Sequence, residues 1–182
     1  MSLDSKEQLM RIGIDTQCVS YIISVMQEVS EPIDNLAPEK IALFRTYLYM
    51  PNTLYITPTV RKECSEISAI VKKEAHDSFF STLFCTLYPE DILKVEQLKN
   101  NYLSFHNHEN DCQILAEAQV VGINTVLSYD FKFISRLSKQ STHVRLLEPT
   151  KFWAEMSIPK GSHPNKKPHW SNPIGSHTWW QW

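Results

Sequence analysis

Apolar residues follow two kinds of spacing along the first 150 positions of the chain. Short apolar runs at 11–15, 54–56, 125–128 and 144–147 are typical of buried strands, and 83–87 is a fifth candidate that also fits a helix. Between these runs, apolar residues recur every three or four positions, as in 17–29, 38–49, 57–71, 92–102 and 111–121. Strands that alternate with helices predict a parallel sheet covered by helices on both faces. We therefore expect a three-layer α/β/α fold with a central parallel sheet of about five strands.

Helix boundaries are marked by residues with special backbone or capping properties. Pro38 suits the first position of a helix, and Thr57 before Pro58 suits a capped helix start. Gly122 suits the position just beyond a helix that opens at Asp111. A further helical stretch is expected from about His76, and a polar surface loop from 106 to 110.

The composition changes after about residue 150. We expect one α/β domain over 1–150 and an irregular extension rich in Trp and Pro over 151–182. This extension holds every tryptophan of the chain, namely Trp153, Trp170, Trp179, Trp180 and Trp182. Lysines interleaved with aromatic rings are typical of single-strand nucleic-acid binding. Docking of the tryptophans on the domain, where they would cover apolar surface, is the interpretation that we favour.

Length and charge set the broad class. The 182 residues suffice for one domain with a substantial core, and the formal net charge of -2 gives no overall basic signature for nucleic acid. No apolar run approaches the roughly 18 residues that span a membrane, and the first ten residues lack the apolar core of a signal peptide. The four cysteines show no metal-binding spacing, and we expect reduced, buried thiols in a cytoplasmic protein with no membrane partner.

Four acids stand at positions where a parallel sheet would gather them. Asp15 ends the first strand and Asp130 follows the strand at 125–128, and ligands of open parallel sheets lie beyond the carboxyl ends of the strands. Glu63 and Asp111 fall in the opening turns of helices that follow loops expected at the same edge. Any one of these acids by itself is more often a helix cap or a solvated surface group. Together they predict a shared pocket.

Carboxylates that converge in this way repel one another, so their convergence implies a bound cation. Ligation by oxygen alone suits Mg²⁺ or Mn²⁺, which keep several waters and bind phosphate groups of substrates. Such ions generate a nucleophile from water and stabilise an in-line displacement at phosphorus. A phosphodiester hydrolase with no Ser, Cys or His nucleophile is the chemistry that this set of residues favours.

Four segments carry a resemblance to a known family. They are IDTQCVSYII around Asp15, ITPTVRKE ending at Glu63, ENDCQILAEAQVVGI around Asp111 and TVLSYDFKF around Asp130. In their order and approximate spacing they are similar to the four signatures of the PIN-domain family. Ser128 stands where that family usually has Thr. The resemblance covers roughly residues 10–150.

Membership of this family would imply a PIN-like α/β/α fold and hydrolysis of RNA or DNA phosphodiesters, with RNA favoured, using Mg²⁺ or Mn²⁺. It would make Asp15, Glu63, Asp111 and Asp130 both the catalytic residues and the metal ligands. Thr16 and Ser128 would support them by hydrogen bonds. The resemblance also implies partners of two kinds, an antitoxin-like protein and a second copy in a homodimer.

Several alternatives stay open at this point. A PIN-like domain can bind nucleic acid or serve as a scaffold without cutting, and some family members are toxins of toxin–antitoxin pairs. The loop His106-Asn107-His108-Glu109 offers a second metal ligand or a proton donor, although a surface loop is the favoured interpretation. A phosphatase of the haloacid-dehalogenase type is excluded, because it needs a second Asp two residues after the first and Gln17 stands there.

Overall fold

The computed structural model describes residues 10–28, 30–51, 53–66, 80, 82–166 and 172–182. Its sheet has five strands in the order β3-β2-β1-β4-β5, and every neighbouring pair is parallel. The strands are β1 (Ile12–Ile14), β2 (Leu54–Ile56), β3 (Phe84–Thr86), β4 (Thr125–Leu127) and β5 (Arg145–Leu147). Each lies within or beside an apolar run that predicted it. The ambiguous run at 83–87 is therefore a strand.

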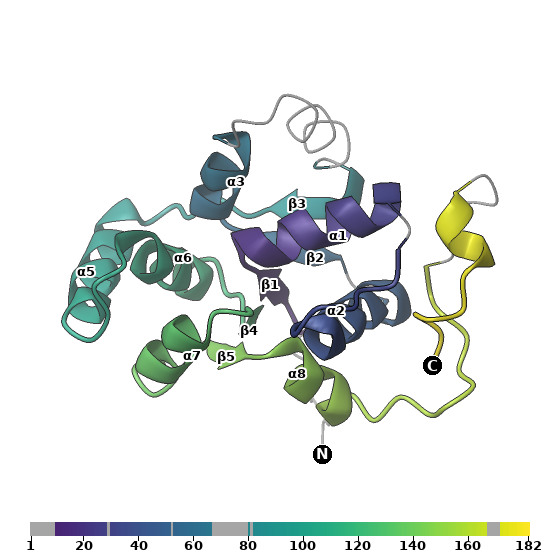
Figure 1. Ribbon diagram of the computed structural model, residues 1–182. Helices are drawn as coiled ribbons and strands as arrows, with labels where there is room; N and C mark the ends of the chain where they lie inside the picture. Colours follow the sequence, from purple (N-terminus) through teal and green to yellow (C-terminus); the bar gives the residue numbers. More distant parts are fainter. Residues whose placement is uncertain (1–9, 29, 52, 67–79, 81, 167–171) are drawn as a thin grey trace, which may run out of the picture.

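Helices cover this sheet and complete the predicted three-layer α/β/α fold (Figure 1). They are α1 (Thr16–Glu28), α2 (Ala37–Tyr49), α3 (Pro58–Ser65), α5 (Ile92–Leu103), α6 (Glu109–Val120), α7 (Phe131–Leu137) and α8 (Pro149–Glu155). Helix α5 packs on α6, and α2 packs on α8. The helical stretch predicted over 67–71 lies outside the described residues, and of the stretch predicted from His76 the structure describes Phe80, Thr82 and Leu83, which are helical. None of the helices that the structure describes is long and apolar enough to cross a membrane.

Strand β1 lies at the centre of the sheet, between β2 and β4. Gly13 pairs with Tyr55 on one side and with Val126 on the other. A Cβ atom at Gly13 would lie 3.0 Å from the side chain of Ile123, so glycine permits the close packing on this strand. Asp15 directly follows β1 and is thus carried to the middle of the carboxyl edge of the sheet.

Helix ends follow from local chemistry, with small departures from the sequence prediction. Thr57 caps α3 by accepting a hydrogen bond from the backbone of Val60, as predicted. Gly122 has a φ of 74°, the left-handed conformation predicted for the residue that ends α6. Pro38 is the second residue of α2 and not the first, and α6 begins at Glu109, two residues before the predicted start.

Helices α7 and α8 have no counterpart in the sequence prediction. Each has seven residues, about two turns, which is too short for a 3.6-residue apolar period to stand out. Their starts are fixed instead by single residues. Asp130 caps α7 through its side chain, and Pro149 begins α8.

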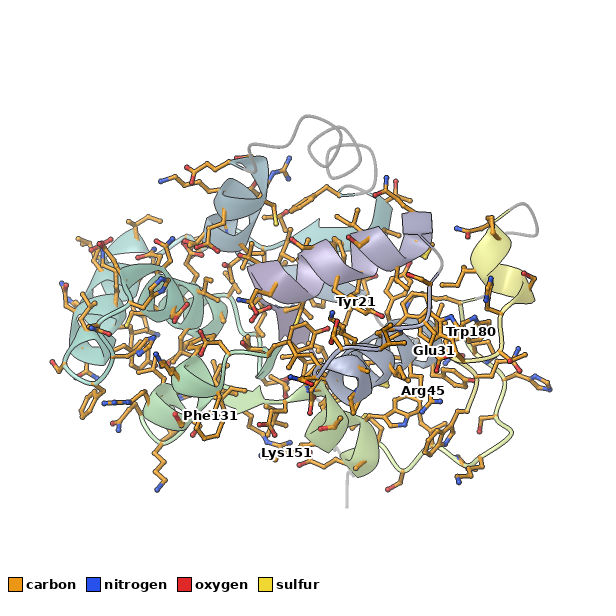
Figure 2. The ribbon with its side chains drawn as sticks, viewed as in Figure 1. Tyr21, Glu31, Arg45, Phe131, Lys151 and Trp180 are labelled. Atoms are coloured by element: carbon orange, nitrogen blue, oxygen red, sulfur yellow. The ribbon has the colours of Figure 1, made fainter. Side chains whose placement is uncertain are left out.

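The Trp-rich extension docks on α2. Trp153 and Trp180 are buried, so the prediction of docked tryptophans is confirmed for these two, while Trp170 lies outside the described residues. Figure 2 shows Arg45 of α2 beside Trp180. The Arg45 guanidinium group donates hydrogen bonds to the carbonyl oxygens of Trp179, Trp180 and Gln181 and lies 4.8 Å from the ring centroid of Trp182. One cation thus holds the main chain of the extension against the domain.

We expect Arg45→Ala to lower the free energy of unfolding by about 1–3 kcal/mol, because several main-chain carbonyl groups lose a charged donor at once. Denaturation followed by tryptophan fluorescence measures this change. Arg136→Ala removes an exposed arginine of α7 and should leave stability within about 0.5 kcal/mol of the wild type. Equal effects of the two substitutions would contradict the role given to Arg45.

Candidate metal centre

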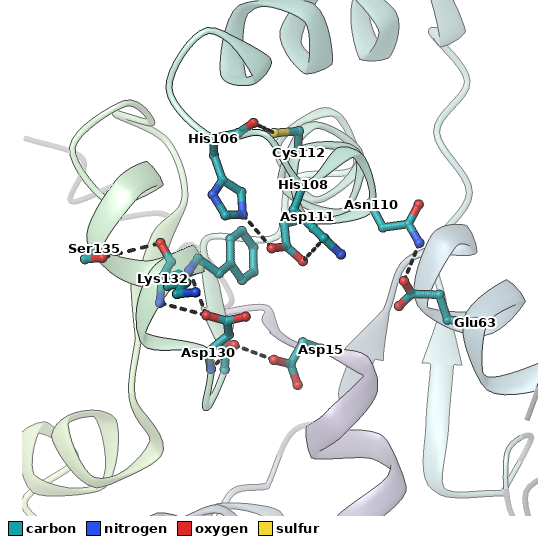
Figure 3. Close-up of polar contacts among 12 residues, drawn as sticks. Asp15, Glu63, His106, His108, Asn110, Asp111, Cys112, Asp130, Lys132 and Ser135 are labelled. Atoms are coloured by element: carbon teal, nitrogen blue, oxygen red, sulfur yellow. Dashed lines mark hydrogen bonds and ion pairs between the residues drawn. The ribbon is translucent and has the colours of Figure 1, made fainter.

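All four acids named in the sequence analysis line one cavity of about 390 Å³. Asp15 comes from the end of β1, Glu63 from α3, Asp111 from α6 and Asp130 from the residue that caps α7. Figure 3 shows the four side chains converging from these elements at the carboxyl edge of the sheet. Other residues of the lining are Thr16, Gln17, Glu66, His108, Asn110, Ile114 and Phe133. The cavity, referred to below as the acidic pocket, is lined by oxygen ligands from four separate segments of the chain.

Asp15 is the most buried of these acids, with 7% of its surface exposed. Its Oδ1 accepts a hydrogen bond of 2.8 Å from the backbone N–H of Cys18, and its Oδ2 accepts one from the hydroxyl of Ser128. Burial raises the pKa of Asp15 above its ordinary value, and the two hydrogen-bond donors lower it in part. The charge of Asp111 raises the pKa of Asp15 as well. Burial therefore disfavours the charged form of Asp15 relative to a carboxyl group in water, and a bound cation would offset that cost.

Ser128 connects Asp15 with Asp130. Its hydroxyl donates to Asp15 and accepts a 2.9 Å hydrogen bond from the backbone N–H of Asp130. Asp130 itself uses Oδ1 to accept hydrogen bonds from the backbone of Lys132 and Phe133. Its Oδ2 has no hydrogen-bond partner among the described residues. One carboxylate oxygen of Asp130 thus orients the side chain, and the other is available to a ligand.

Glu63 is held by two neutral donors. Its Oε2 accepts a hydrogen bond from the hydroxyl of Thr16, and its Oε1 accepts one of 2.5 Å from the side-chain amide of Asn110. Thr16 begins α1 directly after Asp15, and Asn110 precedes Asp111 on α6. The neighbours of two acids of the pocket therefore orient the third.

Glu117 fixes the helix that carries Glu63. It is 5% exposed and accepts hydrogen bonds of 3.0 and 2.8 Å from the backbone and hydroxyl of Thr59 in the first turn of α3. Gln113 donates a further hydrogen bond of 3.0 Å to the same carboxylate. Glu117 is absent from the lining of the acidic pocket. Glu117 therefore joins α6 to α3 outside the acidic pocket.

Asp111 contacts two histidines, and the first of them departs from the predicted surface loop over 106–110: His106 is buried, whereas residues 107–110 are exposed as predicted. The Nε2 atom of His106 lies 2.6 Å from Oδ2 of Asp111, and Nδ1 of His108 lies 3.1 Å from Oδ1. His106 is only 8% exposed, because its ring stacks against Phe133. A polar loop sequence usually indicates exposure, whereas here tertiary packing buries its first residue.

The balance of charge in the acidic pocket follows from the ion pairs and hydrogen bonds of its acids. Within the described ranges, no lysine or arginine forms an ion pair with Asp15, Glu63 or Asp130. Neutral hydroxyl and amide donors hold these carboxylates instead. An oxygen-only donor set with uncompensated negative charge fits Mg²⁺ or Mn²⁺.

Thiolates do not contribute to this donor set. Burial raises the pKa of Cys64 to about 12 and that of Cys112 to about 11, and it raises the pKa of Cys18 as well. These thiols stay protonated near neutral pH, whereas metal ligation requires a thiolate. Cys85 is exposed, contrary to the prediction that every thiol is buried.

The residues that surround the four acids are only partly predictable from sequence. Glu109 belongs to the loop that is named in the sequence analysis as a source of a second metal ligand or a proton donor; its Oε1 atom lies 3.5 Å from Nζ of Lys99, and it does not line the acidic pocket. Asn110 carries no signal in the sequence for its contact with Glu63, because the contact joins positions 47 residues apart. The contact of His108 with Asp111 was not predicted from the sequence, although a spacing of three residues at the start of a helix is a local pattern that could have indicated it.

Comparisons with known proteins add no assignment to this geometry. No family model matches the chain, and no relative was found among curated proteins. The resemblance to the PIN-domain family therefore stays a prediction, and the argument for function rests on the pocket.

Asp15→Asn tests the cost of the buried charge. Because the folded-state pKa of Asp15 lies above its ordinary value of 3.8, its ionisation destabilises the fold above that pH and has no effect where the group is protonated in both states. In EDTA at pH 7 we expect the variant to have a higher Tm than the wild type. The gain should shrink as the pH falls to about 3.5, where thermal denaturation is repeated.

The matched control for this measurement is Asp34→Asn. Asp34 is exposed and the adjacent Lys40 lowers its pKa, so its loss should not stabilise the protein at pH 7. A gain for Asp15→Asn that is the same at both pH values would contradict a cost of ionisation.

Proposed function

We propose that this protein is a metal-dependent nuclease of the PIN-domain kind, which hydrolyses phosphodiester bonds of RNA. The observation that carries the proposal is the acidic pocket itself, where Asp15, Glu63, Asp111 and Asp130 line one cavity and the first of them is buried with no lysine or arginine partner in the described chain. Burying uncompensated carboxylates has a large energetic cost, so the arrangement makes sense as a cation site.

The four acids would hold Mg²⁺ or Mn²⁺. When bound, the ion supplies an activated water and stabilises the charge that develops on the phosphate oxygens. Ser128 and Cys18 hold the carboxylate of Asp15 in one orientation. Thr16 and Asn110 do the same for Glu63. This orientation by neutral donors keeps the ligands in place without competing for the positive charge.

The choice of RNA over DNA and the link to the PIN-domain family rest on the four sequence segments described above. Support from the fold comes from the parallel sheet, since two of these segments end strands at one edge of it. We place the activity in the cytoplasm, where the buried thiols stay reduced. An antitoxin-like protein and a second copy of the chain are the partners that the same resemblance suggests.

A cleavage assay tests the function directly. The metal-free full chain is incubated with single-stranded and structured RNA, and with DNA of the same sequences, in Mg²⁺, Mn²⁺ or EDTA. We expect RNA cleavage that requires metal. Asp15→Asn and Asp111→Asn should each lower the rate by about a hundredfold or more, because transition-state stabilisation by the ion is worth several kcal/mol.

Asp34→Asn is the control for removing a carboxylate, since Asp34 lies in an exposed loop outside the acidic pocket. Its rate should equal that of the wild type. A well-folded wild type that binds Mn²⁺ and cuts neither RNA nor DNA would overturn the nuclease and favour a nucleic-acid-binding or scaffold module.

A second cavity of about 430 Å³ lies next to the acidic pocket and suits the nucleic-acid strand. Lys132 and Arg136 of α7 line it together with Phe105 and Asn107, and His106 lies between this cavity and Asp111. Figure 3 shows Lys132 next to Asp130, whose side chain accepts a hydrogen bond from the backbone of Lys132. Exposed cations beside an acidic site attract phosphate groups that the acids alone would repel.

We expect Lys132→Ala and Arg136→Ala each to raise KM for RNA by about two- to fivefold with little change in kcat, because each removes one exposed phosphate contact. The effect should diminish as salt concentration rises. Lys139→Ala, an exposed lysine that does not line this cavity, is the control. A fall in kcat at unchanged KM would contradict the assignment.

A further inference from the structure

Three side chains beside the acidic pocket form a group of a different chemical kind. His106 and His108 come from the segment between α5 and α6, and Asp111 from the first turn of α6. One ligand atom from each residue lies within 4.8 Å of the other two. Figure 3 shows both imidazole rings turned toward the Asp111 carboxylate. The group combines two nitrogen ligands with one oxygen ligand.

His106 is fixed in place before any ligand binds. The backbone N–H of His106 donates a hydrogen bond of 3.1 Å to the carbonyl oxygen of Tyr102. The backbone carbonyl oxygen of His106 accepts one of 3.3 Å from the thiol of Cys112. Its ring is buried and stacked on Phe133, with centroids 6.4 Å apart and planes at 22°. A buried imidazole with this many constraints loses little further freedom on binding a metal, which favours affinity.

His108 gives this group access to solvent. Its side chain is 63% exposed, and it lines the acidic pocket, whereas the side chain of Asp111 is 16% exposed. An ion entering the pocket therefore meets the imidazole of His108 before the buried ring of His106. His106 is thus the pre-oriented ligand and His108 the accessible one, and both contact the carboxylate of Asp111.

We propose that His106, His108 and Asp111 form a second metal position, which takes a divalent transition ion of the Zn²⁺ class. Two imidazoles and one carboxylate match the ligands that Zn²⁺ uses when it keeps a place for water, and they suit Mg²⁺ poorly. The position shares Asp111 with the all-oxygen site of the proposed nuclease. Its existence rests on these three residues and not on cleavage of RNA.

Binding of Co²⁺, a spectroscopic substitute for Zn²⁺, tests the second position. The metal-free full chain is titrated with Co²⁺ in a Cys85→Ser background, because the exposed thiol of Cys85 is a competing ligand. Millimolar Mg²⁺ is present to occupy the all-oxygen site. We expect visible absorption from one bound Co²⁺ that excess Mg²⁺ does not remove.

His108→Ala should weaken Co²⁺ binding by about tenfold or more, since it removes a ligand and changes an exposed residue that folding does not need. His177→Ala is the matched control, an exposed histidine next to the short helix at Pro173–Ser176, and should bind as the wild type does. Asp15→Asn should retain Co²⁺ binding, because Asp15 is not among the three ligands.

Two results would overturn the second position. One is unchanged Co²⁺ affinity in His108→Ala, and the other is loss of Co²⁺ on addition of Mg²⁺ or in Asp15→Asn, which would place the ion among the four acids. Failure of the nuclease is a separate result. A chain that binds Co²⁺ through His108 but cuts no nucleic acid retains the second position and loses the proposed activity.

Discussion

Burial raises the pKa of Asp15, and the nearby charge of Asp111 raises it further. The fold orients Asp15 and Glu63 with donors that carry no charge: the hydroxyl group of Ser128 donates to Asp15, and the hydroxyl group of Thr16 and the amide of Asn110 donate to Glu63. Neutral donors orient a carboxylate without neutralising it. The negative charge of the pocket is thereby preserved for a cation from solution, which a lysine in the same place would exclude.

The parallel sheet explains why part of this site follows from sequence. Short apolar runs predict the strands, and residues that closely follow a strand lie at the carboxyl edge, which places Asp15 next to the end of β1 and Asp130 three residues after the end of β4. Glu63 and Asp111 are positioned less directly, since they lie on helices whose orientation depends on packing. Their convergence is predicted from the loops that precede these helices, which are expected at the same edge of the sheet, and the structure brings both acids to the same cavity as the strand-end acids.

Some contacts could not be predicted, because they join residues far apart in the sequence and no local pattern marks either residue. His106 sits in a polar stretch that indicates a surface loop, yet Phe133, 27 positions later, buries its ring. Arg45 binds the extension through main-chain carbonyl groups. Because every residue has such a group, the sequence does not indicate which of them Arg45 contacts. The abundance of tryptophan indicated docking, but only the fold reveals which surface receives the rings.

Glu117 never faces the pocket, yet it joins the first turn of α3 to α6 through a carboxylate with three donors. Helix α3 carries Glu63 and α6 carries Asp111, so the contact of Glu117 with Thr59 contributes to the distance between these two acids. Mechanically, the hydrogen bonds of Glu117 tie the start of α3 to α6. These hydrogen bonds oppose separation of the two helices, so they favour an ion or group that fits the existing distance between Glu63 and Asp111 over one that needs a wider pocket.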